Sequence, residues 1–320
     1  MNDKGAIETP QADRLDGLDP PMMALAVPNV SEGRDQAVIA ALVDAIAKTG
    51  TRVADVHSDA DHNRSVLTLA ADPLTLIDGL VALGRACIEH IDLRWHDGVH
   101  PCVGALDVAP IVALEPDDLP LARETAAALA DRLGEELDLP VFRYGAVASS
   151  PARVRPADFR REGYDRLDQQ VREGELVPDA GPPRMHPTAG AVLVGARPPL
   201  IAWNVWLDDG SVIDARAIAA RVRETGGGLP GVRALGVYLP GAGLAQVSMN
   251  IEDYRRASPR MVVDAVRAEA EKVGALPGDS ELVGLIPRAA LSDSSPTALG
   301  LRSFRPGQLL EARIPALRRN

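Results

Sequence analysis

The chain has 320 residues, of which 46 % are hydrophobic and 25 % charged, and its formal net charge is −11. This composition is that of a folded globular protein with one large domain or two of ordinary size. The negative charge argues against broad binding to nucleic acid, which requires clusters of cations. No apolar run reaches the length of a membrane span. The two cysteines, Cys87 and Cys102, form neither a disulfide framework nor a zinc-finger pattern, which favours a reduced, cytoplasmic location.

The first half of the chain alternates apolar strands with amphipathic helices. Residues 1–21 are polar, contain three prolines and lack the apolar core of a secretory signal, so a disordered tail is expected. The hydrophobic pattern then predicts strands at 23–28, 51–57, 65–71, 107–114 and 140–145, and helices at 35–49, 74–91 and 117–137. Pro110 predicts that 107–114 is an edge strand or a broken one.

The second half repeats part of this order after an irregular segment. Residues 146–190 are rich in Arg, Pro and Gly and show little periodicity, which is typical of a functional or disordered segment. Strands are expected at 200–207, 232–239, 244–250 and 280–287, with helices at 212–225 and from a cap at Ser258. The order β-α-β-β-α-β is the ferredoxin-like arrangement. We predict an α/β (α+β) fold of two ferredoxin-like-related subdomains, 22–199 and 200–320, each a mixed β-sheet backed by helices.

Histidines in two loops are the first candidates for chemistry. His57 and His62 lie in HSDADHNR (57–64), and His96 and His100 lie in WHDGVHP (95–101), whereas His90 sits late in a helix. Together with Asp59 and Asp61 these histidines are competent metal ligands. However, no established metal signature is present, and Gly98 and Pro101 disfavour a continuous helix through His96 and His100. A protein-held metal is therefore not expected.

General acid–base catalysis is the second chemistry that these loops support. An unperturbed imidazole titrates near pH ~6.5, so it can take and give a proton near neutrality. A carboxylate such as Asp55, Asp97 or Asp107 would fix its tautomer. For any one loop histidine, a structural role with a hydrogen bond to the backbone is more frequent than a catalytic role. Cys102, two residues after His100, is a geometrically possible nucleophile but is better interpreted as a small buried hydrophobe.

Two further patterns are compatible with a polar binding cleft or with a solvated surface. Arginines are dense in this acidic chain at Arg143, Arg153, Arg155, Arg160, Arg161, Arg184 and Arg197. Such a group would suit a substrate with several carboxylates, although a solvated basic face has nearly equal weight. Gln246, Ser248 and Asn250 share one face of a strand, as Asn204 and Trp206 do, which indicates a sheet surface open to a cleft or to solvent.

Read together, several segments resemble the formiminotransferase domain, in the same order over roughly residues 23–290. They are VPNVSEGRD (27–35), DADHNRSV (59–66), HPCVGALDVAP (100–110), GPPRMHPTAGAVLVGAR (181–197), LIAWNVWL (200–207), LAQVSMN (244–250) and ELVGLIP (281–287). This domain is the transferase part of formimidoyltransferase-cyclodeaminase and of separate bacterial glutamate formimidoyltransferases. The cyclodeaminase part has no counterpart in these 320 residues.

The resemblance implies a function, a site and partners. The family transfers a formimino group from N-formimino-L-glutamate to N5 of tetrahydrofolate, in histidine degradation and one-carbon metabolism, and forms homodimers with the substrates between two subdomains. Its catalytic histidine matches His100. Its folate-binding stretch matches Gly181, Pro182, Pro183, Arg184, Met185, His186, Pro187, Thr188, Ala189 and Gly190. Tetrahydrofolate is then a co-substrate, and neither a metal, a nucleic acid nor a membrane is expected as a partner.

The chain departs from the family pattern at four positions. His57 stands where the vertebrate members have an aspartate that is thought to assist the catalytic histidine, and Cys102 replaces a usual arginine. Met185 and His186 are departures in the folate-binding stretch. Two alternatives stay open at this point: a metal-dependent amidine or amide hydrolase that uses the two histidine loops, and a non-catalytic folate-binding homologue.

Overall fold

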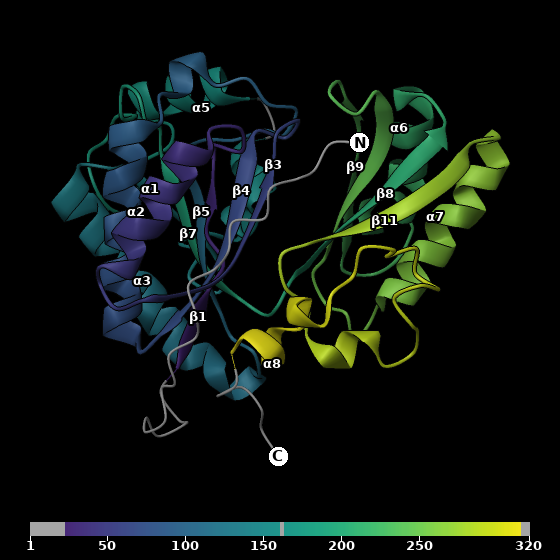
Figure 1. Cartoon of the computed structure of the whole chain (residues 1–320). Helices are drawn as coiled ribbons and strands as arrows, with labels where there is room; N and C mark the ends of the chain where they lie inside the picture. The colour runs from purple at the N-terminus through teal and green to yellow at the C-terminus, as the bar shows by residue number, and fades with distance from the viewer. Residues whose placement is uncertain (1–22, 161–162, 315–320) are drawn as a thin grey trace.

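Two β-sheets stand face to face, and each carries its main helices on its outer side (Figure 1). The computed structural model describes residues 23–160 and 163–314. The predicted tail at 1–21 and the predicted site residue Arg161 lie outside the described residues. Within the described part of the chain, no helix is both long and apolar enough to cross a membrane.

The first sheet is mixed and has seven strands. From one edge to the other, β3 pairs with β4, the short β1 and β2 lie between β4 and β5, and β7 and β6 follow. The pairs from β3 to β5 are antiparallel, whereas β5–β7 and β7–β6 are parallel. The strands are β1 (Ala24–Ala26), β2 (Asn29–Val30), β3 (Arg52–Asp59), β4 (Arg64–Ala71), β5 (Leu106–Val112), β6 (Val141–Gly145) and β7 (Val192–Arg197).

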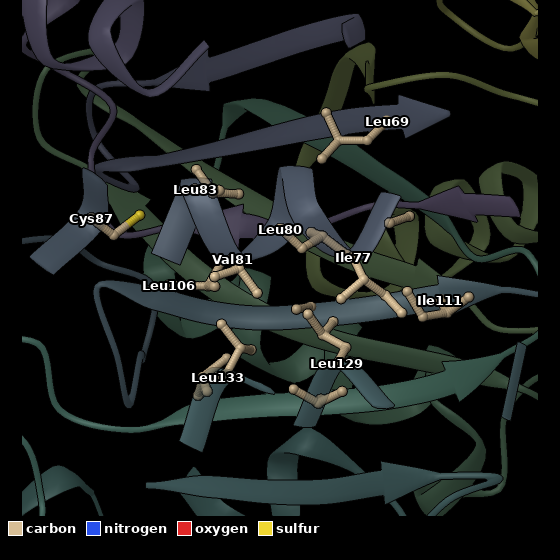
Figure 2. Packing of buried hydrophobic residues seen from close by; sticks show 14 of the residues in the cluster. Leu69, Ile77, Leu80, Val81, Leu83, Cys87, Leu106, Ile111, Leu129 and Leu133 are labelled. Atoms are coloured by element: carbon tan, nitrogen blue, oxygen red, sulfur yellow. The ribbon is translucent and has the colours of Figure 1, made fainter. Parts of the chain in front are cut away.

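Three helices cover the outer face of this sheet, and two shorter ones lie elsewhere in the same half. The helices are α1 (Gln36–Ala47), α2 (Pro73–His90), α3 (Leu119–Leu137), α4 (Pro156–Arg160) and α5 (Tyr164–Arg172). Asp35 and Asp72 cap the amino ends of α1 and α2 with their side chains, as short polar residues do. Leucines of α2 and α3 pack onto Leu106 and Ile111 of β5 to form the main core (Figure 2).

The prediction that Pro110 makes 107–114 an edge or broken strand is wrong. β5 lies between other strands and is buried along its whole length. Pro110 sits opposite the break between β1 and β2, where its carbonyl accepts a hydrogen bond from the N–H of Val27. Because N–H and C=O of one residue face the same side of a strand, the missing N–H of Pro110 falls at this break and not in the ladder with β7.

The prediction that 146–190 is irregular is only partly right, because α4 and α5 form within it. Phe159 of α4 and Leu167 and Val171 of α5 are buried against Phe142 and Leu193, on the sheet face opposite the main helices. The strand β7 was not predicted, although it is a central parallel strand.

The second sheet confirms the predicted β-α-β-β-α-β order. Its elements are β8 (Ile201–Asp209), α6 (Val212–Val222), β9 (Val232–Leu239), β10 (Leu244–Ile251), α7 (Pro259–Val273) and β11 (Leu276–Val283). The strand order β11-β8-β10-β9 is that of the ferredoxin-like arrangement, and the pairs are antiparallel. The last helix, α8 (Leu310–Arg313), returns to the first sheet, where Leu310 packs with Leu25 and Val112.

The two faces of the second sheet differ as the strand alternation predicts. Ala245, Val247 and Met249 of β10 are buried in the core with α6 and α7. Gln246 points the other way, and its side chain bonds to His62 in the β3–β4 turn of the first sheet. This polar face of the second sheet therefore meets the histidine loops of the first sheet.

Candidate active site

Three loops of the first sheet are held together by one asparagine. Asn63, in the β3–β4 turn, has a positive φ of 46°, a left-handed conformation that asparagine tolerates. Its Oδ1 accepts from the N–H of Gly33 at 3.0 Å, and its Nδ2 donates to the carbonyl of Asp97 at 3.1 Å. A Cβ added at Gly98 would lie 2.5 Å from the His62 carbonyl oxygen, so this close approach requires glycine. The predicted histidine loops therefore meet in space.

His100 lies in the segment before β5 and is partly buried. Its Nδ1 is 2.9 Å from the Pro101 carbonyl oxygen, which can only accept a hydrogen bond. The Nδ1 therefore carries the proton, and Nε2 of the neutral ring is left as a proton acceptor. None of the three carboxylates proposed from the sequence is bonded to this ring. A backbone carbonyl fixes the tautomer in their place.

Asp107 instead binds two arginines. Its carboxylate is fully buried and accepts from Arg64 Nη1 at 2.5 Å, from Arg160 Nη2, and from the N–H of Val103 at 2.8 Å. Burial alone would raise the pKa of Asp107, but the two guanidinium groups and the Val103 amide hold that pKa well below its usual range. The cluster therefore has one negative and two positive charges beside His100.

These charges act on the catalytic candidate. Burial lowers the pKa of His100 well below its usual value, and the positive charges of Arg64 and Arg160 lower it further, against the opposing effect of Asp107. His100 is therefore a neutral imidazole at neutral pH. This is the protonation state that a general base needs.

The second sheet reaches this site from across the molecule. His62 Nε2 is 3.0 Å from Gln246 Oε1, and the His62 ring centroid is 6.1 Å from that of His100. The Asp61 carboxylate accepts from the N–H groups of Gly241 at 2.6 Å and Ala242 at 3.3 Å, in the β9–β10 turn. The two halves of the molecule thus touch beside His100.

A second contact between the halves involves His57, which the sequence placed with the other loop histidines. His57 lies on β3, and its Nε2 is 3.7 Å from Glu281 Oε1 on β11. The other carboxylate oxygen of Glu281 accepts from Asn204 Nδ2 at 3.2 Å. Asn204 thus points to the side that the strand pattern predicted, where it meets an acidic side chain rather than open solvent.

A cavity of about 280 Å³ opens beside His100 and is lined also by His96, Cys102, Arg160 and Tyr164. Burial raises the pKa of the Cys102 thiol, which therefore stays protonated and is a poor nucleophile.

The last residue of the predicted folate-binding stretch 181–190 lies close to Tyr164, which lines this cavity. The carbonyl of Thr188 accepts from the N–H of Leu93 at 2.8 Å, and a Cβ added at Gly190 would lie 3.2 Å from Tyr164. His186 Nδ1 accepts from the N–H of Ala189 at 3.0 Å, which shapes the loop from within.

The predicted group of arginines is not gathered into one wall. Of its described members, Arg160 alone lines the cavity. Arg143, Arg155 and Arg184 pair with nearby aspartates, and Arg153 and Arg197 bond to backbone carbonyls. Among the described residues, no group of three or more His, Cys, Asp or Glu side chains is placed to hold a metal ion. His90 is exposed at the end of α2.

Sequence reasoning missed Arg64 and Glu281 as site residues and did not connect Gln246 with His62. Arg64 follows the histidine loop directly and lies within the DADHNRSV segment, so its position was a usable signal. The contact of Gln246 with His62 joins residues 184 positions apart, which no local pattern reveals.

The fold and site define a two-subdomain α/β protein with a neutral, half-buried histidine beside the place where the two sheets meet. The chain belongs to the formiminotransferase domain family: residues 23–197 match the N-terminal subdomain of the formiminotransferase domain, and residues 202–297 match the formiminotransferase domain. The resemblance drawn from the motifs is thus confirmed.

Stand-alone relatives match over nearly their whole length. The glutamate formimidoyltransferase of Thermoplasma acidophilum is 38 % identical over 291 residues, which cover 90 % of this chain and 96 % of that protein. The glutamate formimidoyltransferase of Streptococcus pyogenes is also 38 % identical, over 87 % of this chain and 93 % of that protein. The formimidoyltransferase-cyclodeaminase of Rattus norvegicus is 37 % identical over 84 % of this chain, which is 51 % of its own length.

Proposed function

We propose that this protein is a glutamate formimidoyltransferase that moves a formimino group from N-formimino-L-glutamate to N5 of tetrahydrofolate, with His100 as its proton carrier. The observation that carries the proposal is the fixed tautomer of His100, whose Nδ1 is bonded to the Pro101 carbonyl beside a cavity. Family membership and the two full-length relatives supply the reaction type.

The reaction needs one proton to be moved between two nitrogens. N5 of tetrahydrofolate attacks the amidine carbon of the donor, which forms a C–N bond and a tetrahedral intermediate. The proton that N5 loses passes to Nε2 of His100. His100 returns it to the departing glutamate nitrogen as the original C–N bond breaks, so L-glutamate leaves and 5-formimidoyltetrahydrofolate remains.

The surroundings of His100 suit both transfers. The lowered pKa of His100 keeps the ring neutral, so it is ready to accept the first proton. Once protonated, the ring is a cation near Arg64 and Arg160, which makes it ready to release the proton. A side chain in this role contributes a rate factor of roughly 10²–10⁴, and positioning of the two substrates side by side supplies the rest.

The binding roles follow from the charges and loops around the cavity. The excess positive charge of Arg64 and Arg160 over Asp107 favours a donor that bears carboxylates. We propose that the stretch Gly181 to Gly190 binds tetrahydrofolate as co-substrate, which is supported by the close approach of Gly190 to Tyr164, a residue that lines the cavity. The mechanism itself uses no metal.

The assembly and location belong to the same proposal. We propose subdomains at 22–199 and 200–320 in a homodimer, as the family resemblance implies, and a cytoplasmic place in histidine and one-carbon metabolism. The free thiols of Cys87 and Cys102 fit a reducing compartment. Light scattering of the purified chain, with twice the monomer mass expected, tests the dimer.

A donor and acceptor test decides the activity. Purified protein is expected to release glutamate from N-formimino-L-glutamate only when tetrahydrofolate is present, with a folate product heavier by the formimino group in mass detection. Turnover without tetrahydrofolate that chelation abolishes would point to a metal-dependent hydrolase. Tetrahydrofolate binding without turnover, across a panel of amidine and formyl donors, would contradict the assigned transfer.

A further inference from the structure

His62 stands between the proposed proton carrier and the second sheet, and the mechanism above gives it no part. It comes from the β3–β4 turn of the first sheet, and its N–H bonds to Asp59 Oδ1 at 2.7 Å. Its ring is buried, with the centroid 6.1 Å from that of His100 and tilted by 52°. Because Oε1 of Gln246 can only accept, the Nε2 of His62 carries a proton and donates it across the boundary.

Gln246 is the anchor of this contact. Its side chain is fully buried, and its Nε2 has no hydrogen-bond partner among the described residues. Burying an amide donor without a partner costs free energy, so packing alone does not explain a glutamine at this place. The bond that Gln246 makes is the one that holds the His62 ring. The neighbouring Asp61, bonded to the N–H groups of Gly241 and Ala242, fixes the same turn at a second point.

We propose that His62 is a positioning residue for the transfer, held by Gln246 of the second sheet so that its ring stands beside His100. The proposal rests on the proposed function, because it concerns the proton that His100 takes up. The positive charge of a His62 imidazolium opposes protonation of the His100 ring at this separation and so lowers the pKa of His100. The bond between His62 and Gln246 thus helps to set the pKa of His100. Below that pH the His100 ring is protonated and transfer stops.

Other charged groups face the same pair, and they are constant in the variants proposed below. Arg64 of β4, Asp107 of β5, Arg160 of α4 and the thiol of Cys102 surround His100. On the side of His62, the carboxylates of Asp59, at the end of β3, and of Asp61, in the β3–β4 turn, are bonded to backbone N–H groups.

Replacing His62 tests the coupling through the acid limb of the pH profile of kcat/KM, which reports protonation of His100 in the free enzyme. His62→Gln removes the ionisable ring but keeps an amide that can bond to Gln246. The limb is expected to move to higher pH by roughly 0.5 to 2 units, the effect of one charge at this distance for effective dielectric constants of about 80 to 20. His62→Lys, which keeps a positive charge, is expected to hold the limb near its native position.

Gln246 is tested by a double-mutant comparison. Gln246→Met releases the His62 ring without a change in charge. The acid limb of the kcat/KM profile is therefore expected to move to higher pH, but by less than in His62→Gln. In a chain that already carries His62→Gln, the same change at Gln246 is expected to leave the limb where it is. Equal shifts in both backgrounds would overturn the role assigned to Gln246.

A titration without substrate separates this inference from the proposed function. The C2–H resonance of His100 in the full chain, assigned with His100→Gln, is expected to titrate at higher pH in His62→Gln than in the native protein. An unchanged midpoint in folded protein would overturn the coupling. A shifted midpoint in a protein that shows no folate-dependent turnover would sustain the coupling and contradict the transfer.

Discussion

Asp107 is the residue on which the electrostatics of the site depend most. Its carboxylate is fully buried between Arg64 and Arg160, which are themselves largely buried. Two guanidinium groups so close together repel one another unless a negative charge lies between them. The carboxylate therefore keeps Arg64 and Arg160 in place beside His100.

Asp107→Asn is expected to lower the free energy of unfolding by about 3–5 kcal/mol, because it leaves buried positive charge without its counterion. Urea unfolding at pH 7.5 measures the change. Asp44→Asn is a matched control, since its pair with Lys48 is exposed and is worth at most ~0.5 kcal/mol. Equal losses of stability for the two substitutions would refute the role of Asp107 as the buried counterion of Arg64 and Arg160.

His100 also links stability to pH. Its pKa is lowered by burial and by Arg64 and Arg160, so below the unfolded value of ~6.5 the unfolded chain binds a proton that the folded chain does not. Stability therefore falls as the pH drops from 6.5, with a slope of up to about 1.4 kcal/mol per pH unit from this one residue. Comparison of His100→Gln with the native chain by urea unfolding at pH 7.5 and 5.5 should show a smaller loss in the variant. An equal loss of unfolding free energy in both proteins would show that ionisable groups other than His100 cause the acid sensitivity.

The family motifs singled out His100 from four loop histidines, but they could not supply its surroundings. Arg64 and Arg160 reach Asp107 from 43 and 53 positions away. A local pattern does not report such contacts. The sequence suggested Asp107 as a hydrogen-bond partner of the imidazole, whereas in the structure its carboxylate binds Arg64 and Arg160.

Among the elements, those with strong local signals were predictable. Pro73 and Ser258 marked the starts of α2 and α7, and the alternation in 244–250 gave the faces of β10 correctly. β7 was missed because it is short, is buried and follows a Pro- and Gly-rich segment. The prediction of an edge strand from Pro110 was wrong because it considered one strand alone. The neighbouring strand is interrupted between β1 and β2, at Val27, and this break accommodates the proline.

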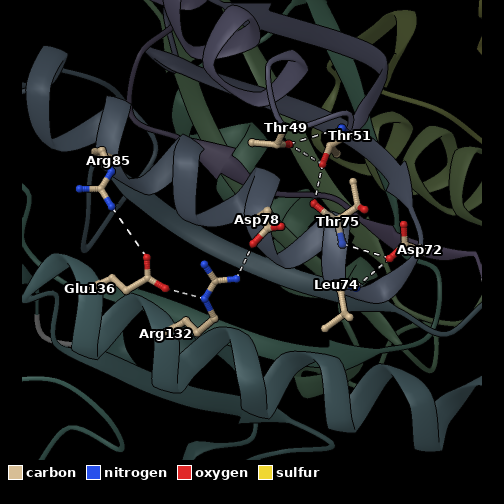
Figure 3. A network of polar contacts seen from close by, with 9 residues as sticks. All are labelled: Thr49, Thr51, Asp72, Leu74, Thr75, Asp78, Arg85, Arg132 and Glu136. Atoms are coloured by element: carbon tan, nitrogen blue, oxygen red, sulfur yellow. Dashed lines mark hydrogen bonds and ion pairs between the residues drawn. The ribbon is translucent and has the colours of Figure 1, made fainter.

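The side chain of Asp72 at the amino end of α2 allows the contribution of a helix cap to stability to be tested. Asp72 accepts from the N–H groups of Leu74 and Thr75, each at 3.1 Å, whereas Asp78 on the same helix pairs with Arg132 at the surface (Figure 3). Asp72→Ala is expected to cost about 1 kcal/mol, because it leaves helix-end N–H groups without their partner. Asp78→Ala is the control and is expected to cost less, because exposed ion pairs contribute little. Thermal unfolding of both variants measures this, and a larger loss for Asp78→Ala would contradict the role of the cap.

At the scale of the whole molecule, the two sheets are joined around the site. The chain crosses between them from β7 to β8, and α8 returns to pack on the first sheet. Asp61 and His62 connect the same halves beside His100. The order of elements in the second half was predictable from hydrophobic periodicity. The way in which the two sheets face each other was not, because it depends on contacts between residues far apart in the chain.

We propose that His100 carries the proton in transfer of the formimino group to tetrahydrofolate. The most direct measurement is mass detection of the folate product formed by the native chain, by His100→Ala and by His90→Ala, with folded state and tetrahydrofolate binding checked for each. We expect His100→Ala to bind tetrahydrofolate but to lower the rate roughly 10²- to 10⁴-fold. His90→Ala, which changes an exposed histidine at the end of α2, should keep the native rate. Native-like turnover by folded His100→Ala would contradict the role of His100 as proton carrier.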